Sequence, residues 1–282
     1  MRIAITGSNG QLGMALRHTF CDHTLMNIDL PDYDITSLDS ILEAVGLFDP
    51  ELIIHCAAIT DVDGCESNPE LAYRVNVLGT RNMAVAAQQC DAPMVYISTD
   101  YVFDGKRTEP YWEWDTPAPQ SVYARTKWLG EEQVRQLLQR FYIVRVAWLY
   151  GSGPRNFVRT VLRLSEERDT LQMVTDEVGS PTYAQDVAGA LARLTTQPAY
   201  GTYHLPNDGV CSRYAWAQEI LRLADRSEAV ELLPSENYPR AATVPKQVAM
   251  RNFAAAELGI TMRSWQEALR DYMGHINGFR NC

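Results

Sequence analysis

The chain has 282 residues, enough for one large α/β domain or for a nucleotide-binding domain with a smaller second lobe. Hydrophobic residues make up 46% and charged residues 21% of the sequence, a composition that excludes a disordered or fibrous protein. Acidic residues outnumber basic ones by 35 to 25, and the net charge of −10 argues against nucleic acid or an anionic membrane surface as a partner.

The first functional motif lies near the N-terminus. Residues 2–6 are an apolar run that predicts a buried strand, and a helical pattern extends through residue 20. Between them, Gly7, Gly10 and Gly13 form a Gly-x-x-Gly-x-x-Gly turn. Glycines between a strand and a helix let backbone N–H groups approach a pyrophosphate, which a Cβ would obstruct. The turn therefore predicts a dinucleotide site, although surface turns also use glycine for its positive φ.

The next predicted strand, residues 24–28, ends at Asp29. An acid at this position can accept hydrogen bonds from the adenosine ribose hydroxyls, which favours NADH over NADPH. Two alternatives stay open. Arg17 could still reach a 2′-phosphate, and Asp29 could instead be a turn acid beside Pro31.

Residues 51–56 predict another central strand, and the small residues 57–60 that follow would let a cofactor lie over the sheet edge. His55 lies within this apolar run, so a hydrogen-bonded structural histidine is favoured over a catalytic one. Residues 69–89 carry apolar side chains at near-helical spacing and predict one long core helix.

Residues 94–98 predict the next strand, which delivers Thr99 and Asp100 at its carboxyl end. Open parallel sheets bind ligands at that end. Ser98 and Thr99 are adjacent on a strand, so their side chains point to opposite faces and only one easily serves a given site; Thr99 is the candidate. Residues 100–120 predict a long loop, and loops of this length are often functional.

Tyr123 and Lys127 are the central pair of candidate catalytic residues. Residues four apart lie on one face of a helix, so the phenol and the ammonium would point into one site. A neighbouring cation favours the phenolate and brings a tyrosine closer to useful acid–base chemistry. Tyr-x-x-x-Lys also occurs by chance in helices where the lysine is merely solvated. Much of the evidence that this pair is catalytic therefore comes from the motifs upstream of it.

Residues 142–147 predict a further strand, followed by Trp148, whose ring could stack on a flat base or sugar. A turn-rich segment then leads to a helix that starts near residue 184. The predicted fold is α/β: a Rossmann-type doubly wound parallel sheet with a smaller C-terminal α/β lobe. We expect residues 1–150 to bind the dinucleotide, with 184–205 contributing, and residues 151–183 and 206–282 to form the substrate-binding lobe.

The cysteines show neither a Cys-x-x-Cys pair nor zinc-ligand spacing, so they are expected to be reduced packing residues. They are Cys21, Cys56, Cys65, Cys90, Cys211 and Cys282. No stretch approaches 18 consecutive apolar residues and no signal peptide is evident, so a cytoplasmic location is expected.

Six motifs together point to one family. They are residues 6–13, 56–66, 98–105 (Ser-Thr-Asp-Tyr-Val-Phe-Asp-Gly), 123–127, 148–150 (Trp-Leu-Tyr) and 176–182 (Asp-x-x-Gly-x-Pro-Thr). With them the chain resembles the extended short-chain dehydrogenase/reductase superfamily and, within it, the dTDP-4-dehydrorhamnose reductases. The resemblance covers most of the chain, most strongly to about residue 190, and the motifs at 98–105 and 176–182 are its most specific parts.

The resemblance implies reduction of the 4-keto group of dTDP-4-dehydro-β-L-rhamnose to dTDP-β-L-rhamnose by NADPH or NADH. It implies that Tyr123 donates the proton, that Thr99 donates a hydrogen bond to the same oxygen, and that Lys127 holds the nicotinamide ribose. Thr99, Asp100 and Trp148 would contact the nucleotide sugar. The residues expected to line the cofactor, with Asp34 and Ile35 near the adenine, are Gly7, Gly10, Gln11, Leu12, Gly13, Asp29, Asp34, Ile35, Ala58, Ile59, Thr60, Tyr123 and Lys127.

The chain departs from the family pattern at two places. Some members bridge subunits with a divalent metal held by acids, one of them on the first helix, but residues 11–20 contain no acid. We therefore predict no metal, and either a monomer or a homodimer. The family's C-terminal Arg-Pro segment, which helps to bind the nucleotide end of the substrate, appears here as Val244-Pro245-Lys246. Lys246 or Arg240 could supply the charge, or the preferred nucleotide sugar differs.

Two other functions stay open at this point. One is reduction of another dTDP-4-keto-6-deoxysugar, which needs the same chemistry in a different substrate site. The other is a non-catalytic regulatory subunit that binds the cofactor and a partner enzyme. The presence of Thr99, Tyr123 and Lys127 argues against the regulatory subunit.

Overall fold

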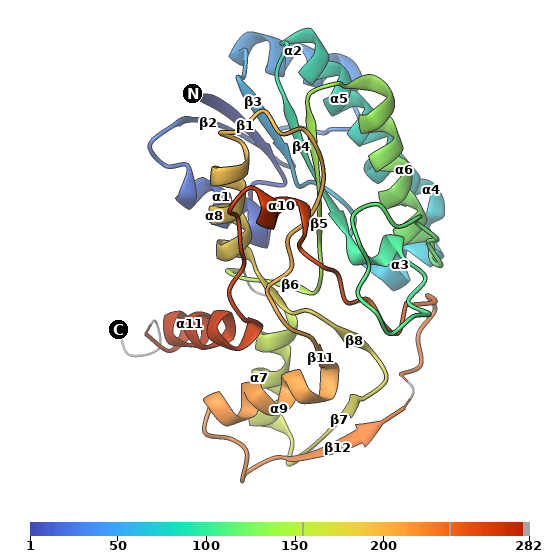
Figure 1. The fold of residues 1–282 in the computed structure, drawn as a ribbon, viewed down its shortest axis with the longest axis vertical. Coiled ribbons are helices and arrows are strands. Elements are labelled where there is room, and N and C mark those ends of the chain that lie inside the picture. The colour runs from blue at the N-terminus through green and yellow to red at the C-terminus, as the bar shows by residue number, and fades with distance from the viewer. Residues whose placement is uncertain (154, 237, 279–282) are drawn as a thin grey trace.

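The computed structural model describes residues 1–153, 155–236 and 238–278, and a six-stranded parallel sheet forms its centre (Figure 1). The strands run in the order β10-β5-β4-β3-β1-β2 across the sheet. Their bounds are β1 (Arg2–Thr6), β2 (Thr24–Ile28), β3 (Leu52–His55), β4 (Met94–Thr99), β5 (Phe141–Val146) and β10 (Gly201–His204). The chain order reverses between β1 and β3, and such a switch point opens a crevice at the carboxyl ends of the strands.

Helices cover both faces of this sheet, as Figure 1 shows. α1 (Gln11–Thr19) and α8 (Ala184–Leu194) pack on one face, against Ile3 and Ile5 of β1. α2 (Leu38–Phe48), α5 (Thr80–Gln89) and α6 (Val122–Leu137) pack on the other, against Ala4 of the same strand. Because side chains alternate along a strand, a strand covered on both faces must be apolar throughout, which explains its continuous apolar sequence.

The helix expected over residues 69–89 contains a π-helical segment. α4 (Pro69–Tyr73) continues into η1 (Arg74–Gly79), which has π-helical geometry, and then into α5; the short α3 (Val62–Ser67) precedes them. The helix expected over residues 69–89 is thus present without a break, and no pattern in the sequence indicated its π-helical part. Single π turns inside helices are rare and occur frequently at functional sites.

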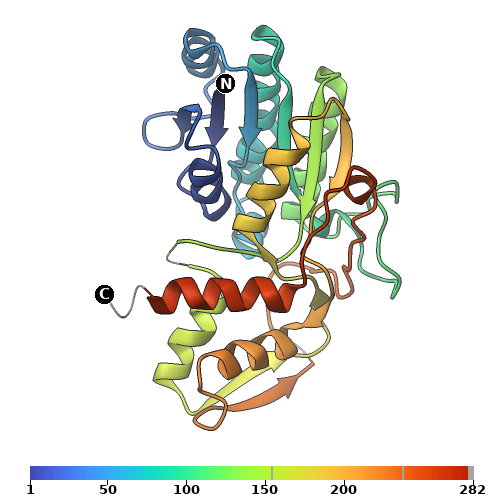
Figure 2. The same ribbon diagram turned by 60° about the vertical axis from the view of Figure 1, so that its left-hand side comes forward.

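A second lobe lies beyond the carboxyl ends of the strands (Figure 2). Its helices are α7 (Phe157–Glu167), α9 (Arg213–Leu223) and α11 (Trp265–Gly278), which share one hydrophobic core around the buried Trp216. Short parallel and antiparallel pairs complete it: β7 (Thr170–Val174) with β12 (Glu231–Ser235), β8 (Val178–Gly179) with β11 (Cys211–Ser212), and β6 (Leu149–Tyr150) with β9 (Thr182–Tyr183).

The chain crosses between the two lobes more than once. Residues 184–204 return to the sheet as α8 and β10. The short α10 (Ala254–Glu257) also returns, because Ala255 and Ile260 belong to the core that α1 and α8 form with the sheet. The domain boundaries set out above stay a prediction, and Val244, Met250 and residues 254–262 of the proposed second lobe pack on the first.

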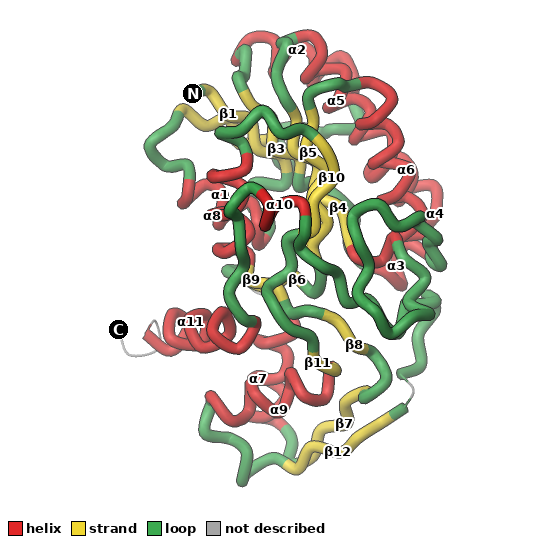
Figure 3. Tube along the Cα trace, in the orientation of Figure 1, coloured by secondary structure: helices red, strands yellow, loops and turns green. Residues whose placement is uncertain are grey.

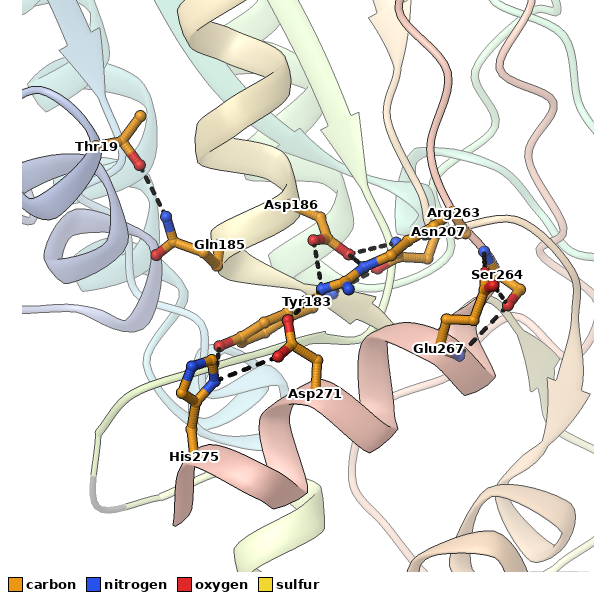
Figure 4. Close-up of polar contacts among 10 residues, drawn as sticks. All are labelled: Thr19, Tyr183, Gln185, Asp186, Asn207, Arg263, Ser264, Glu267, Asp271 and His275. Atoms are coloured by element: carbon orange, nitrogen blue, oxygen red, sulfur yellow. Dashed lines mark hydrogen bonds and ion pairs between the residues drawn. The ribbon is translucent and has the colours of Figure 1, made fainter. Parts of the chain in front are cut away.

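A polar cluster around Arg263 joins α11 to α8 (Figure 4). The Arg263 guanidinium contacts Asp186 of α8 at 2.8 Å and Asp271 of α11 at 2.7 Å. Asn207 donates to Asp186 from its side chain at 2.8 Å and accepts the Tyr183 backbone N–H at 2.8 Å. These contacts fix the second lobe against the sheet beside the cavity that lies between them.

The stretch between β4 and α6 is almost entirely loop, apart from the 3₁₀ turn η2 (Asp100–Val102) that follows β4 (Figure 3). This confirms the long loop expected from the sequence. None of the described helices is long and apolar enough to cross a membrane. All five cysteines within the described residues are free thiols, and Cys282 lies outside the described residues.

Candidate active site

A cavity of about 810 Å³ lies at the carboxyl ends of the strands, and all the site residues predicted from the sequence line it. They are Gly7, Gly10, Gln11, Leu12, Gly13, Asp29, Asp34, Ile35, Ala58, Ile59, Thr60, Thr99, Asp100, Tyr123, Lys127 and Trp148. The structure thus brings the whole predicted set together, while the role of each residue stays a prediction. The lining that lies outside the motifs includes Tyr33, Leu71, Val75 and Arg213.

The glycine turn forms one end of the cavity and has no room for side chains. Gly7 has a φ of +64°, and a Cβ on Gly13 would lie 2.2 Å from the Gly7 carbonyl oxygen. No side chain caps the N-terminus of α1, which begins just after Gly10. Uncapped backbone N–H groups at a helix N-terminus suit a phosphate, so this end of the cavity fits the pyrophosphate of a dinucleotide.

Asp29 connects the end of β2 to the glycine turn. Its carboxylate accepts the backbone N–H groups of Asn9 and Leu30, both at 2.9 Å. The side chain is therefore a turn acid that also lines the cavity, and its contact with a ribose stays a prediction. Arg17 donates to the Asn9 side chain at 3.4 Å, which places a guanidinium beside the same turn.

A buried amide holds the segment that crosses the sheet edge. Asn76, in the π-helical η1, accepts the Ile59 backbone N–H at 2.8 Å and donates to the Ile59 carbonyl at 3.1 Å. The same amide donates to Thr126 of α6 at 3.0 Å. Asn76 therefore fixes the cavity wall at Ala58–Thr60 relative to the helix that carries Tyr123, a role that no spacing in the sequence indicated.

His55 is the structural histidine expected from the sequence. It is fully buried between Thr6, at 2.6 Å, and Thr80, at 3.1 Å. Burial and the nearby Lys127 charge lower its pKa to about 3, so the ring is neutral at pH 7. It does not line the cavity.

α6 presents Tyr123 and Lys127 to the cavity from its first two turns. Ser121 caps the helix by accepting the Ala124 N–H at 3.2 Å, and Glu66 accepts the Val122 N–H at 2.7 Å. These bonds satisfy donors that a helix N-terminus otherwise leaves free. The cap therefore sets where the helix begins, and so which face carries the two side chains.

Lys127 is almost completely buried, and its surroundings hold it in one position. The ammonium donates to the Ile97 carbonyl at 2.7 Å and lies 4.2 Å from the centroid of the Tyr96 ring. Burial lowers the pKa of Lys127 to about 7, and the charge of Glu131 partly offsets this effect. Lys127 therefore releases its proton more easily than a lysine in water does.

Tyr123 is buried with its phenol beside Thr99. Burial raises the pKa of Tyr123, and a hydrogen bond with Thr99 opposes that increase. The ring of Tyr101 lies edge-on to Tyr123, with ring centroids 5.8 Å apart. The phenol is thus protonated in this environment, as a proton donor must be.

Thr99 and Asp100 extend this polar group at the end of β4. Thr99 donates to one carboxyl oxygen of Asp100 at 2.9 Å, and the other oxygen, Oδ2, has no partner among the described residues. Burial raises the pKa of Asp100 to about 7. Ser98 instead donates to Glu131 at 2.6 Å, which supports the choice of Thr99 as the hydroxyl for the site.

Trp148 and Arg213 form the opposite wall, on the side of the second lobe. Trp148 has a φ of +42°, a left-handed conformation that is unusual for a bulky residue and that clusters at functional sites. Its ring lies over Gly179, where a Cβ would be 2.8 Å from the indole. The Arg213 guanidinium lies over the Trp148 ring, 3.6 Å from the ring centroid.

The fold and the cavity define the class of the protein. A parallel sheet with a glycine turn at its switch point, beside a helix that carries Tyr-x-x-x-Lys, is the architecture of the Rossmann-type short-chain dehydrogenases/reductases. More specifically, the chain belongs to the family described as RmlD substrate binding domain, whose model matches residues 1–277.

Similar proteins cover nearly the whole chain. The spore coat polysaccharide biosynthesis protein SpsK of Bacillus subtilis is 36% identical and covers 96% of either chain. The dTDP-4-dehydrorhamnose reductase of Mycolicibacterium smegmatis is 36% identical over 98% of this chain and 86% of that relative. A crystal structure of the dTDP-4-dehydrorhamnose reductase from Bacillus anthracis in complex with NADP is 39% identical, with a TM-score of 0.94 and coverage of 97% and 99%. These matches confirm the expected fold class and the expected assignment to the NAD(P)-dependent reductases.

Proposed function

We propose that this protein reduces the 4-keto group of dTDP-4-dehydro-β-L-rhamnose to give dTDP-β-L-rhamnose. The observation that carries the proposal is that Thr99, Tyr123 and Lys127 line the same cavity as the glycine turn. The name of the Mycolicibacterium smegmatis relative supports the choice of substrate. NADPH is the proposed cofactor, because the Bacillus anthracis relative was solved with NADP and Arg17 lies beside the turn that Asp29 holds.

The residues of the chain divide the binding of the cofactor and the substrate between them. Gly7, Gly10 and the N-terminus of α1 would hold the pyrophosphate, and the wall fixed by Asn76 would support the nicotinamide end. Lys127 would hold the nicotinamide ribose. When bound, the reduced cofactor supplies a hydride for the ketone carbon.

Tyr123 and Thr99 would complete the reduction at the oxygen atom. As negative charge develops on the ketone oxygen, the Tyr123 phenol gives it a proton and Thr99 donates a hydrogen bond to it. Lys127, one helical turn from Tyr123 and in the lining of the same cavity, would stabilise the tyrosinate left behind through its positive charge. The Thr99 hydroxyl has one hydrogen, which Asp100 accepts in the structure, so the hydroxyl would turn from Asp100 to the ketone oxygen when the substrate binds.

An assay of nicotinamide absorbance tests the proposal. Purified protein is mixed with dTDP-4-dehydro-β-L-rhamnose and either NADPH or NADH, and the product is identified by mass spectrometry. Consumption of the reduced cofactor with formation of dTDP-rhamnose is expected. A different dTDP-4-keto-6-deoxysugar that turns over much faster would move the assignment to that substrate, and cofactor binding without any turnover would support the regulatory subunit instead.

A further inference from the structure

Arg213 is a cation in the cavity wall that no motif identified. It is the first residue of α9, where Ser212 caps the helix by accepting the Ala215 N–H at 3.0 Å. Its guanidinium stacks on Trp148 at 3.6 Å and lies 5.2 Å from the centroid of Phe157. Stacking on two rings fixes the plane of the guanidinium and leaves its edge for polar partners.

The polar partners of Arg213 leave part of that edge free. Nε lies 3.5 Å from Glu177 Oε2, and the Arg213 backbone N–H donates to the Glu177 carbonyl at 3.2 Å. The terminal Nη atoms make no hydrogen bond with the described residues. Arg213 lines the cavity, so these N–H groups are available to a ligand there.

The rest of the cavity offers little positive charge to an anion. Its lining contains Asp29, Asp34 and Asp100, and the only other cation among the described lining residues is Lys127. Lys127 already donates to the Ile97 carbonyl and lies at the Tyr123 end. A diphosphate entering the substrate side therefore needs a separate cation, and Arg213 is in that position.

The two basic residues expected to serve the nucleotide end bind elsewhere. The Lys246 ammonium lies 2.7 Å from Asp176, and the Arg240 guanidinium lies 3.3 Å from Asp63. Neither lines the cavity. Val244 instead packs with Tyr101 and Tyr123 in an apolar cluster. Among the described residues, Arg213 of α9 is thus the arginine that lines the cavity.

We infer that Arg213 binds the diphosphate of the nucleotide-sugar substrate; this inference rests on the proposed function. In that substrate the C4 ketone lies across the pyranose ring from the anomeric carbon that carries the diphosphate. The anion must therefore lie about one sugar ring from Thr99 and Tyr123, and Arg213 lines the same cavity as these two residues. A guanidinium held flat on an indole can donate two parallel hydrogen bonds to phosphate oxygens.

Titration calorimetry with dTDP, in the presence of saturating NADPH, tests the inference. Arg213→Gln is expected to weaken dTDP binding by roughly 10²-fold, and Arg213→Lys, which keeps the charge but not the fork, by about 10-fold. The control variants Arg240→Gln and Lys246→Gln are expected to stay within about 3-fold of the wild type, because both residues lie outside the cavity.

Two further probes separate loss of charge from loss of structure. Thymidine, which lacks the phosphates, is expected to bind Arg213→Gln as it binds the wild type, and the affinity for NADPH is expected to stay unchanged. Equal loss of dTDP, thymidine and NADPH binding in both Arg213 variants would overturn the inference in favour of a structural role. So would unchanged dTDP binding by Arg213→Gln, a comparable loss in Arg240→Gln, or a wild-type chain that does not bind dTDP.

The binding experiment does not depend on turnover. A chain that binds dTDP through Arg213 but reduces no 4-keto sugar would keep the inference and defeat the proposed function. If the wild type reduces the sugar and Arg213→Gln still binds dTDP normally, the proposed function holds and the inference about Arg213 is wrong.

Discussion

Replacing Lys127 by methionine is expected to stabilise the protein at neutral and acidic pH while it abolishes turnover. Methionine has a similar length and no charge. In the wild type, burial lowers the pKa of Lys127 from 10.5 to about 7, so the folded chain resists a proton that the unfolded chain accepts. The resulting decrease in the unfolding free energy of the wild type is fully present below pH 7, and it disappears as the pH rises towards the unfolded pKa of 10.5.

The size of the effect follows from the two pKa values. Each pKa unit corresponds to about 1.4 kcal/mol, so the difference in unfolding free energy between the variant and the wild type should shrink by roughly 4 kcal/mol from pH 6 to pH 10. The loss of the ammonium's bond to the Ile97 carbonyl and of its contact with Tyr96 affects the absolute values. These losses do not depend on pH in the same way, so the test is the change with pH in the difference between the two unfolding free energies.

Urea unfolding of both proteins at pH 6, 8 and 10, followed by circular dichroism, measures this difference. Arg125→Met is the matched control, because Arg125 is exposed on the same helix and its removal should give a nearly constant difference across the pH range. A Lys127→Met difference that is flat with pH, or that grows in the variant's favour towards pH 10, would refute the account of a desolvated ammonium.

Four further outcomes are expected. Tyr123→Phe should lower turnover by on the order of 10²-fold or more while the Kd for NADPH, measured by fluorescence, changes little; full activity would contradict the role of the phenol. Asp100→Asn should stabilise the chain more at pH 8 than at pH 4, as measured by urea unfolding. Burial raises the Asp100 pKa from 3.8 to about 7, so the wild type loses unfolding free energy as the pH rises between these two values, and the variant does not. A larger stabilisation at pH 4 than at pH 8 would be inconsistent with a buried neutral acid. Gly13→Ala should weaken NADPH binding at least 10-fold by calorimetry, because the added Cβ would lie 2.2 Å from the Gly7 carbonyl oxygen. The control Gly189→Ala should bind NADPH normally, because the space around a Cβ at Gly189 is open. Arg263→Gln should lower the unfolding free energy by about 1–2 kcal/mol, because it releases Asp186 and Asp271, and an unchanged Tm would argue against the interlobe cluster.

Local sequence patterns were sufficient to predict strands β1 to β5 and the residues along the sheet edge, whereas β10 was not predicted as a strand. Each central strand is a short apolar run, and in a parallel sheet the residues that follow such runs meet at one edge. Gly7, Ala58 and Thr99 could therefore be placed around one cavity from their positions after β1, β3 and β4. Alternation of side chains along a strand indicated that only one of Ser98 and Thr99 easily serves a given site, but it did not by itself select Thr99.

Contacts between segments far apart in the chain could not be predicted in the same way. Arg213 reaches the cavity only because α9 packs with Trp148 and Phe157, and that packing depends on the arrangement of the second lobe. Asn76 holds Ile59 from a π-helical turn, and helical periodicity gives no sign of such a turn. The return of Ala255 to the sheet core likewise depends on tertiary packing rather than on local pattern.

Isotope transfer tests the central claim most directly. The protein is supplied with NADPH carrying deuterium at C4 of the nicotinamide, on one face or the other, and with dTDP-4-dehydro-β-L-rhamnose, and the product is analysed by NMR. Wild-type protein is expected to place one deuterium at C4 of the sugar from one face of the nicotinamide only, and Tyr123→Phe to do so far more slowly. A product without deuterium at C4, or one labelled equally from both faces, would contradict a single cavity that holds the nicotinamide and the ketone beside Tyr123.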